Sequence, residues 1–442
     1  MSVFKRIAGR IDVRRLILTL VSRGLSTIFS FALIFSLARV LSAEEYGLYA
    51  MLFSIGSALG LVLTSGQATL IVKHFNREDP PGDNINRQLI AHNLVWQAVA
   101  LALVWGAGWL VWATGVGQLS PIAILAVLIF SSVFLLSEYF QSYFRARNQL
   151  KLALVPRENF WRPFATVLVW FSVFLGVSLG GATALLLVAG CLALAVFYQS
   201  FFFVRDARRR SETGAASRDE TASLSYWDKE SIYFGLNGFM TAVALHIEVV
   251  IVGFVLGLEE VALFFVLFRL AMLLNLPQIS METFAMPMIA ERMREGDRKE
   301  AQKLLSAFAA VTFLLSLAGA AVLVPLSPYV VKLFNPEFEV SGLLMLAIAS
   351  QTVVMAFFGL GTSTLMISGG ERYFLLYRSV LYLIYAVSLV LFGWIGGLMG
   401  VALTMTGFVL IEHMLAAAWC RRKVGVDITA AGAIGVFATT RG

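Results

Sequence analysis

Five arginines lie inside or at the edge of long apolar stretches of this sequence: Arg23, Arg157, Arg162, Arg269 and Arg378. A guanidinium group stays charged and presents a planar fork of donors, a geometry that suits phosphate oxygens. An ionisable side chain at the centre of a membrane helix costs at least about 2.5–3.5 kcal/mol unless it faces a cavity or a partner. We therefore predict that these arginines line a positively charged cavity that binds phosphate or acidic groups.

The depth of each arginine in its stretch leaves a second interpretation open for some of them. Arg23 and Arg269 lie about seven and eight residues into their stretches, roughly 10 and 12 Å deep. Arg157 and Arg378 lie nearer a predicted membrane surface and could instead extend to water there. Glu158 precedes Arg162 by four residues, the order that favours a helical ion pair, so Arg157 is expected to be the free cation of its segment.

Three further ionisable residues are candidates for ion coupling or gating: Glu138, His246 and Glu248. A buried carboxylate can exchange a proton or hold sodium, although structural pairing with an arginine explains it equally well. His246 and Glu248 are two residues apart and do not share a helix face, so they are not predicted to form one site. Glu412 and His413, near the end of the last apolar stretch, are expected at the membrane interface.

No metal site or catalytic site is predicted. The four histidines are scattered, and both cysteines fall in or beside apolar stretches, which argues against a cysteine metal site or a disulfide framework. No GxxxxGK[ST] loop occurs, and no polar segment is long enough for a nucleotide-binding domain. We therefore expect no cofactor, with proton or sodium coupling left open.

The elements that position these residues are about twelve apolar stretches of roughly 20 residues each. Hydrophobic residues make up 59% of the 442 residues and charged residues only 14%, with a mean hydropathy of +0.81. Stretches of this length cross a hydrocarbon core of about 30 Å as helices, so the fold class predicted is an all-α polytopic membrane protein. The predicted spans are 16–38, 46–72, 91–113, 121–143, 152–176, 180–204, 231–256, 261–286, 304–325, 343–368, 374–396 and 398–420.

Basic residues cluster at the N-terminus and in every second gap between these stretches, and they continue after the last one. Such gaps face the cytoplasm, which predicts cytoplasmic N- and C-termini. The net charge of +7 is explained by this bias together with anionic lipid headgroups and needs no nucleic acid. The gaps with basic residues hold Arg77 and Arg87, Arg145 and Arg147, Arg205 to Arg218, Arg292 to Lys303, and Arg372.

The chain contains an internal repeat. VLSAEEYGLYAMLFSI (Val40 to Ile55) aligns without gaps on VLGLEEVALFFVLFRL (Val255 to Leu270), and a weaker match relates Arg157 to Arg378. Each half has six stretches, so the predicted fold is two parallel six-helix lobes around a central cavity. The predicted divisions are an N-terminal lobe (1–210), a cytoplasmic linker (211–229), a C-terminal lobe (230–420) and a cytoplasmic tail (421–442). Tyr226 and Trp227 suggest an interfacial anchor before the second lobe.

Four segments resemble a known family: ARVLSAEEYGLY, IEVVIVGFVLGLEEVALFFVLFRL, MPMIAERMREGDRKEAQKLL and KLFNPEFEVSGLL. They are similar to the oligosaccharide flippases, the polysaccharide-transporter or Wzx-like branch of the multidrug/oligosaccharidyl-lipid/polysaccharide (MOP) exporter superfamily. The resemblance implies a two-lobed transporter of the bacterial inner membrane. Its cargo would be a polyprenyl-diphosphate-linked oligosaccharide, moved to the periplasmic leaflet by alternating access. One departure is that Glu248 is followed by Val249, where such proteins often carry a basic residue.

Two other classes remain as alternatives. A drug exporter of the same superfamily would share the architecture, but the apolar stretches here hold more arginine than carboxylate, which favours an anionic substrate. A membrane glycan polymerase or ligase needs a sizeable periplasmic region, and the longest such gap is about Leu326 to Gly342. We therefore expect a transporter and not an enzyme. The expected partners are the lipid-linked glycan, membrane lipids and possible polymerase and chain-length proteins.

Overall fold

The computed structural model describes residues 13–75, 85–115, 119–212 and 224–433. Every regular element in those ranges is a helix, so the predicted all-α fold class is confirmed. The chain forms two compact units, Met1–Val250 and Ile251–Gly442. The predicted boundaries of lobes, linker and tail stay a prediction. Residues 213–223 of the predicted linker and 434–442 of the predicted tail lie outside the described residues.

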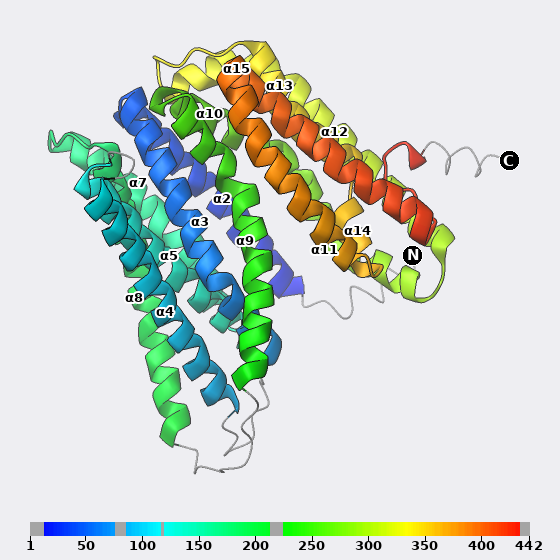
Figure 1. The fold of residues 1–442 in the computed structure, drawn as a ribbon, viewed down its shortest axis with the longest axis horizontal. Helices are drawn as coiled ribbons and strands as arrows, with labels where there is room; N and C mark the ends of the chain where they lie inside the picture. The colour runs from blue at the N-terminus through cyan, green and yellow to red at the C-terminus, as the bar shows by residue number, and fades with distance from the viewer. Residues whose placement is uncertain (1–12, 76–84, 116–118, 213–223, 434–442) are drawn as a thin grey trace. The chain divides into compact units, whose positions relative to one another are not determined.

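The first unit is a bundle in which α3, α5 and α8 pack closely on one another (Figure 1). Aromatic rings fill its core, and the Tyr143 and Phe203 rings meet edge to face with centroids 4.8 Å apart. The helices begin and end as follows: α2 (Val13–Val40), α3 (Ala43–His74), α4 (Ile85–Thr114), α5 (Pro121–Ala146), α6 (Leu150–Leu154), the π-helix η2 (Val155–Phe160), α7 (Trp161–Phe174), α8 (Gly181–Glu212) and α9 (Leu224–Val255), of which α9 continues into the second unit.

The second unit packs α13 between α12 and α15. Its helices are α10 (Leu258–Met272), the short 3-10 helix η3 (Leu273–Asn275), α11 (Leu276–Arg294), α12 (Arg298–Phe334), α13 (Gly342–Phe357), α14 (Gly361–Ile367), α15 (Glu371–Trp419) and the π-helix η4 (Cys420–Val424).

Nine helices of the described chain are long and apolar enough to cross a membrane, or ten if the bent pair α13–α14 is one span. The twelve predicted stretches differ from single helices in four places. The fifth stretch is divided among α6, η2 and α7, none of which is long enough alone, and the eighth continues from α10 through η3 into α11. The tenth is the bent pair α13–α14, and the eleventh and twelfth stretches are joined as α15. The multi-pass membrane architecture follows from either count.

The 49 residues of α15 form a helical hairpin whose two arms Figure 1 shows side by side. Gly397 has φ 58° and ψ −148°, a backbone conformation that glycine adopts far more readily than other residues. Contacts between the arms are arranged symmetrically about it, with the Tyr382 and Phe408 rings 4.9 Å apart and Arg378 beside Glu412. The arms cross so closely near the turn that a Cβ on Gly400 would lie 1.9 Å from the carbonyl oxygen of Phe392.

The internal repeat marks the same kind of turn in both units. In the first, Ser42 caps α3 by accepting a hydrogen bond from the Glu45 amide, and Glu44 and Glu45 lie in the first turn. In the second, Glu259 and Glu260 occupy the first turn of α10, but Gly257 replaces the capping serine with φ 108°. Glu45 also accepts a hydrogen bond from the Gly181 amide at 2.5 Å. This glutamate therefore fixes the start of α8 against α3.

The segment after α15 packs on the second unit. Gln302 of α12 donates to the Asp427 carbonyl and accepts from the Asp427 amide, both at 2.6 Å. The Ala430 amide donates to the carbonyl of Phe357, at the end of α13, at 2.8 Å. Ile428 is fully buried beside Gly361. Residues 425–433 therefore form an ordered cover over α12 and α13, which the sequence did not predict.

Candidate functional site

The π-helix η2 carries one of the predicted arginines into an ion pair. Arg157 pairs with Glu138 of α5 and donates to the Gln141 side chain at 2.6 Å. Its guanidinium also lies over the Phe134 ring, 5.4 Å from the centroid. The expectation that Arg157 is the free cation of this segment is therefore wrong. The reason is packing, because α5 places a carboxylate opposite η2 that the local spacing could not reveal.

The Glu158 carboxylate faces α5 as well. It accepts a hydrogen bond from Gln141 at 3.1 Å and lies 3.8 Å from Arg145. Arg162 instead donates to the main-chain oxygen of Glu158 at 2.8 Å. The expected pair between Glu158 and Arg162 does not form, because the wider π-helical turn changes the spacing on which that expectation depended.

Helix α2 supplies the other wall of this site. Ser26 accepts a hydrogen bond from Arg162 at 2.9 Å, and Ser22 accepts one from Asn159 at 2.8 Å. Arg23 lies between these two serines in the sequence, and its side chain is exposed. Arg145 is within electrostatic range of both Arg23 and Arg157. Helices α2, α5 and η2 therefore gather several predicted arginines in one place.

We define the arginine cluster as these four guanidinium groups with the two carboxylates beside them: Arg23, Arg145, Arg157, Arg162, Glu138 and Glu158. Within this cluster four cations meet two anions, and Arg145 lies in the last turn of α5. Such an excess favours an anionic ligand, and guanidinium groups suit phosphate in particular. A π-helical turn often occurs at a functional site, because it displaces side chains from the regular helix spacing.

Arg378 forms a similar ion pair in the second unit. Its Nε lies 3.0 Å from Glu412, and its guanidinium lies 4.9 and 5.3 Å from the ring centroids of Phe374 and Tyr382. Glu412 and His413 are both 5% exposed, and their expected depth at the membrane interface stays a prediction. The arms of α15 fold Glu412 inward against Arg378. The two arginines related by the repeat, Arg157 and Arg378, thus each meet a glutamate, although from non-equivalent helices.

The remaining predicted residues are placed on α9 and α10. Arg269 is half-buried in α10, with its guanidinium 4.8 Å from the centroid of the Phe265 ring. His246 and Glu248 of α9 are 8% and 3% exposed. Burial of a carboxylate to this extent is costly in an apolar environment, which is consistent with a coupling role or a structural pairing. The roles of all three residues stay predictions.

A polar cluster at the start of α9 was missed from the sequence. Glu230 lies 2.6 Å from Lys73 and 2.5 Å from His74, and Asp228 accepts hydrogen bonds from His92 at 2.9 Å and Trp96 at 3.0 Å. Trp227 is buried against the His92 ring, so its expected role as an interfacial anchor is wrong. The sequence signal that could have predicted these contacts was opposite charge, because Asp228 and Glu230 lie near the start of α9 and Lys73 and His74 lie at the end of α3.

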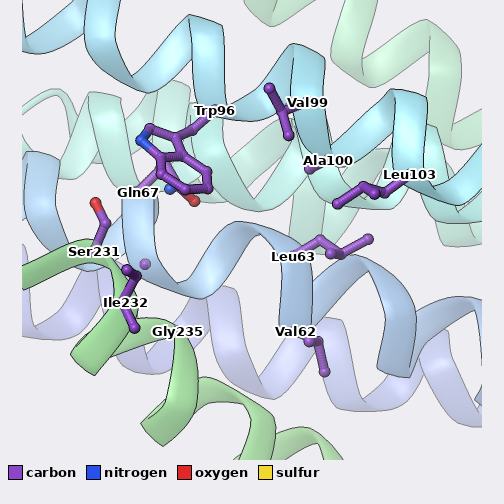
Figure 2. Close-up of a pocket in the computed structure, with 11 residues that line it drawn as sticks. Val62, Leu63, Gln67, Trp96, Val99, Ala100, Leu103, Ser231, Ile232 and Gly235 are labelled. Carbon is purple, nitrogen blue, oxygen red and sulfur yellow. The ribbon is translucent and has the colours of Figure 1, made fainter. Parts of the chain in front are cut away.

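A pocket lies next to this cluster, between α3, α4 and α9 (Figure 2). Its volume is about 160 Å³, and its lining is apolar apart from Gln67, Ser231 and the indole of Trp96. A drug-sized ligand typically occupies about 300–1,000 Å³, so this pocket is too small to hold an oligosaccharide. None of the predicted site residues lines it.

Comparison with solved structures identifies the fold. An inward-facing multidrug resistance MATE family transporter of the MOP superfamily matches with a TM-score of 0.68 and 15% identity, covering 90% of this chain and 94% of that chain. An outward-facing one matches with a TM-score of 0.60 and 16% identity, covering 91% and 93%. A third match is a MOP superfamily transporter from Pyrococcus furiosus, with a TM-score of 0.57 and 14% identity, covering 91% of this chain and 93% of that chain. That transporter is described as having a binding pocket of reverse polarity, which suggests a different function.

The fold is therefore that of the MOP-superfamily transporters, as the resemblance in the sequence indicated. The family model for polysaccharide biosynthesis proteins matches residues 13–293. This chain belongs to that family. A comparison with curated proteins gives no significant match.

Proposed function

We propose that this protein is a flippase for polyprenyl-diphosphate-linked oligosaccharides. It moves them from the cytoplasmic to the periplasmic leaflet of the bacterial inner membrane by alternating access, with both termini in the cytoplasm. The product serves synthesis of a surface polysaccharide such as O-antigen, exopolysaccharide or capsule. The observation that carries this proposal is the arginine cluster, in which four guanidinium groups face two carboxylates.

The residues divide into two roles in this proposal. Arg23, exposed on α2, and Arg269 of α10 bind the diphosphate, while Arg162 contributes a guanidinium oriented by Ser26. Arg157 and Arg378 are assigned to the same cargo as further cations, each held in place by its glutamate. Glu248, with Glu138 and His246, is assigned to ion coupling or gating, since buried ionisable groups respond to protons or sodium.

The charge of the cargo gives transport a direction. Each elementary charge that crosses a potential of about 100 mV exchanges roughly 2.3 kcal/mol, so export of a diphosphate from a negative cytoplasm is favourable. ATP is not needed for this step. We infer a transporter and not an enzyme, one whose partners include membrane lipids and, in the pathway, a polysaccharide polymerase and chain-length proteins.

A cation-coupled multidrug exporter is the second candidate. The observations in its favour are the fold shared with multidrug transporters and the buried carboxylate of Glu248. A cationic drug would nevertheless meet the net positive charge of the arginine cluster. The excess of arginine over carboxylate in that cluster supports an anionic cargo instead.

Separate Arg23→Ala and Arg269→Ala substitutions test the flippase proposal in cells. A charge-assisted contact to phosphate contributes about 1.5–3 kcal/mol, so the amount of surface glycan should fall at least about tenfold in each variant. The measurement is surface glycan per cell in a strain that depends on this protein, with the membrane-inserted protein quantified in parallel.

Arg39→Ala is the matched control, because Arg39 is exposed on the same helix as Arg23 but lies in the last turn of α2. It should leave glycan export unchanged. Normal export in both the Arg23→Ala and Arg269→Ala cells, at equal protein levels, would contradict the assignment of these arginines to the cargo.

A further inference from the structure

A second cationic site lies entirely within the second unit, apart from the predicted cargo site. The ends of α11 and α14, the start of α12 and η4 surround a hollow of about 540 Å³. Arg294, Arg298 and Lys423 line it together with Ser368. A hollow of this size can accept a phosphate group with its substituents.

The three cations of this hollow carry charge that the described residues do not neutralise. Arg294, Arg298 and Lys423 have no carboxylate within 4 Å among those residues, whereas other cations of the same end of the unit take up the nearby acids. The pairs are Arg292–Glu295 at 2.7 Å, Lys303–Glu300 at 3.4 Å and Arg421–Asp427 at 2.8 Å. The hollow therefore presents three cations that no carboxylate of the described residues approaches within 4 Å.

Ser368 also lines the hollow. Its Oγ has almost no exposed surface and no hydrogen-bond partner among the described residues, so this hydroxyl lies behind the lining. The polar groups that a ligand in the hollow can reach are therefore the three cations.

The chain end holds this site together. Gln302 fixes Asp427 to α12, which places Gly425 so that a Cβ there would lie 3.7 Å from Nη1 of Arg298. Gly425 has φ 80°, a left-handed conformation that turns the chain sharply after Lys423. The cover formed by residues 425–433 therefore brings η4 next to the start of α12.

The other half of the lining is apolar and continues into exposed apolar side chains. Met293 and Ile367 line the hollow, and Ile367 and its neighbour Met366 are 46% and 44% exposed. Large exposed apolar side chains on a membrane-spanning helical protein face acyl chains. A free inorganic anion would contact only the cations, whereas a phospholipid would contact the cations with its phosphate and the apolar side chains with its acyl chains.

We propose that this hollow binds the phosphate of an anionic phospholipid, with the acyl chains along Met366 and Ile367. Basic pockets at the ends of membrane helices bind anionic headgroups in this way. The inference depends on the membrane-spanning fold and not on the identity of the cargo. Bound lipid would tie α11, α12, α14 and the chain end to one leaflet.

The test compares two charge-matched double variants of the full-length protein. In Arg294→Gln/Arg298→Gln the hollow loses two cations, and in the control Arg292→Gln/Lys303→Gln the same end of the unit loses two cations that are already paired. Each protein is purified with phosphatidylglycerol or with phosphatidylcholine of the same acyl chains, and bound lipid is counted by native mass spectrometry. Phosphatidylglycerol occupancy should fall at least about tenfold in the first variant only, because both charge-assisted contacts are lost.

Other outcomes overturn the proposal. Equal loss in the two double variants would mean general charge attraction, and no loss in either would mean that the hollow is not the site. A further arm adds inorganic pyrophosphate at millimolar concentration to the wild-type protein. If pyrophosphate binds in the absence of lipid and displaces phosphatidylglycerol completely, the ligand is a soluble phosphate and the lipid assignment fails. Melting temperatures of all proteins confirm that the variants remain folded.

Discussion

An Arg157→Gln protein should be far less stable than the wild type. The change leaves the Glu138 carboxylate, whose side chain is 16% exposed, without the guanidinium that pairs with it. Removing one partner of a buried ion pair typically costs about 3–5 kcal/mol, since an uncompensated charge remains in an environment of low polarity. The measurement is the thermal unfolding midpoint of purified protein in detergent, together with the yield of folded protein from membranes.

The double variant Glu138→Gln/Arg157→Gln separates structure from cargo binding. Because it removes both charges, it should recover most of the lost stability while glycan export stays low. Arg145→Gln is the control for removal of a cation from the same cluster, since Arg145 is 40% exposed and lies 3.8 Å from Glu158. A double variant as unstable as Arg157→Gln alone would show that the ion pair is not what Arg157 provides.

A Gly400→Ala protein should fail to form the α15 hairpin correctly. The added Cβ would lie 1.9 Å from the Phe392 carbonyl oxygen, a main-chain atom that cannot move away without separating the arms. Overpacking of this kind should cost about 3 kcal/mol or more, the upper end for an inserted methyl group. The expected result is a large drop in the monodisperse fraction on size-exclusion chromatography and a lower unfolding midpoint.

Gly407→Ala provides a matched control on the same arm of α15. A Cβ at this position meets nothing within 4 Å, and alanine favours a helix over glycine by up to about 1 kcal/mol. This variant should be as stable as the wild type or slightly more so. If Gly400→Ala behaved like Gly407→Ala, the close crossing of the two arms would be refuted.

The apolar stretches predicted most of the fold because the membrane fixes their length and forces them to be helices. The repeat likewise predicted a turn that recurs in both units, since the paired glutamates at the start of α3 and α10 stabilise helix N-termini. The join of the last two stretches into α15 was harder to foresee. It depends on the backbone angles of Gly397, and a glycine in a membrane helix more often marks close packing.

The candidate site could be predicted by residue type but not by pairing. Arg157 and Arg378 are recognisable as candidates in the sequence because arginine within an apolar stretch is costly. Their partners Glu138 and Glu412 come from segments 19 and 34 positions away, so only tertiary packing brings them together. The π-helix at Val155–Phe160 changed the local spacing that had suggested a pair between Glu158 and Arg162.

The contacts of Asp228 and Glu230 were missed for a similar reason. Both residues follow a polar, charged segment, a composition that is typical of a linker. Their partners Lys73, His74 and His92 lie on α3 and α4, more than a hundred residues earlier. The sequence therefore indicated which residues carry charge but not which helices the charges join.

Reconstituted vesicles offer the most direct test of the central claim, that the positively charged site moves a lipid-linked anionic glycan. Purified protein would be incorporated into vesicles that contain a labelled polyprenyl-diphosphate oligosaccharide, and its transfer between leaflets followed after a membrane potential is imposed. We predict transfer without ATP that is lost in the Arg23→Ala/Arg269→Ala protein. No transfer above that of protein-free vesicles, in protein that does export a cationic drug, would contradict the account.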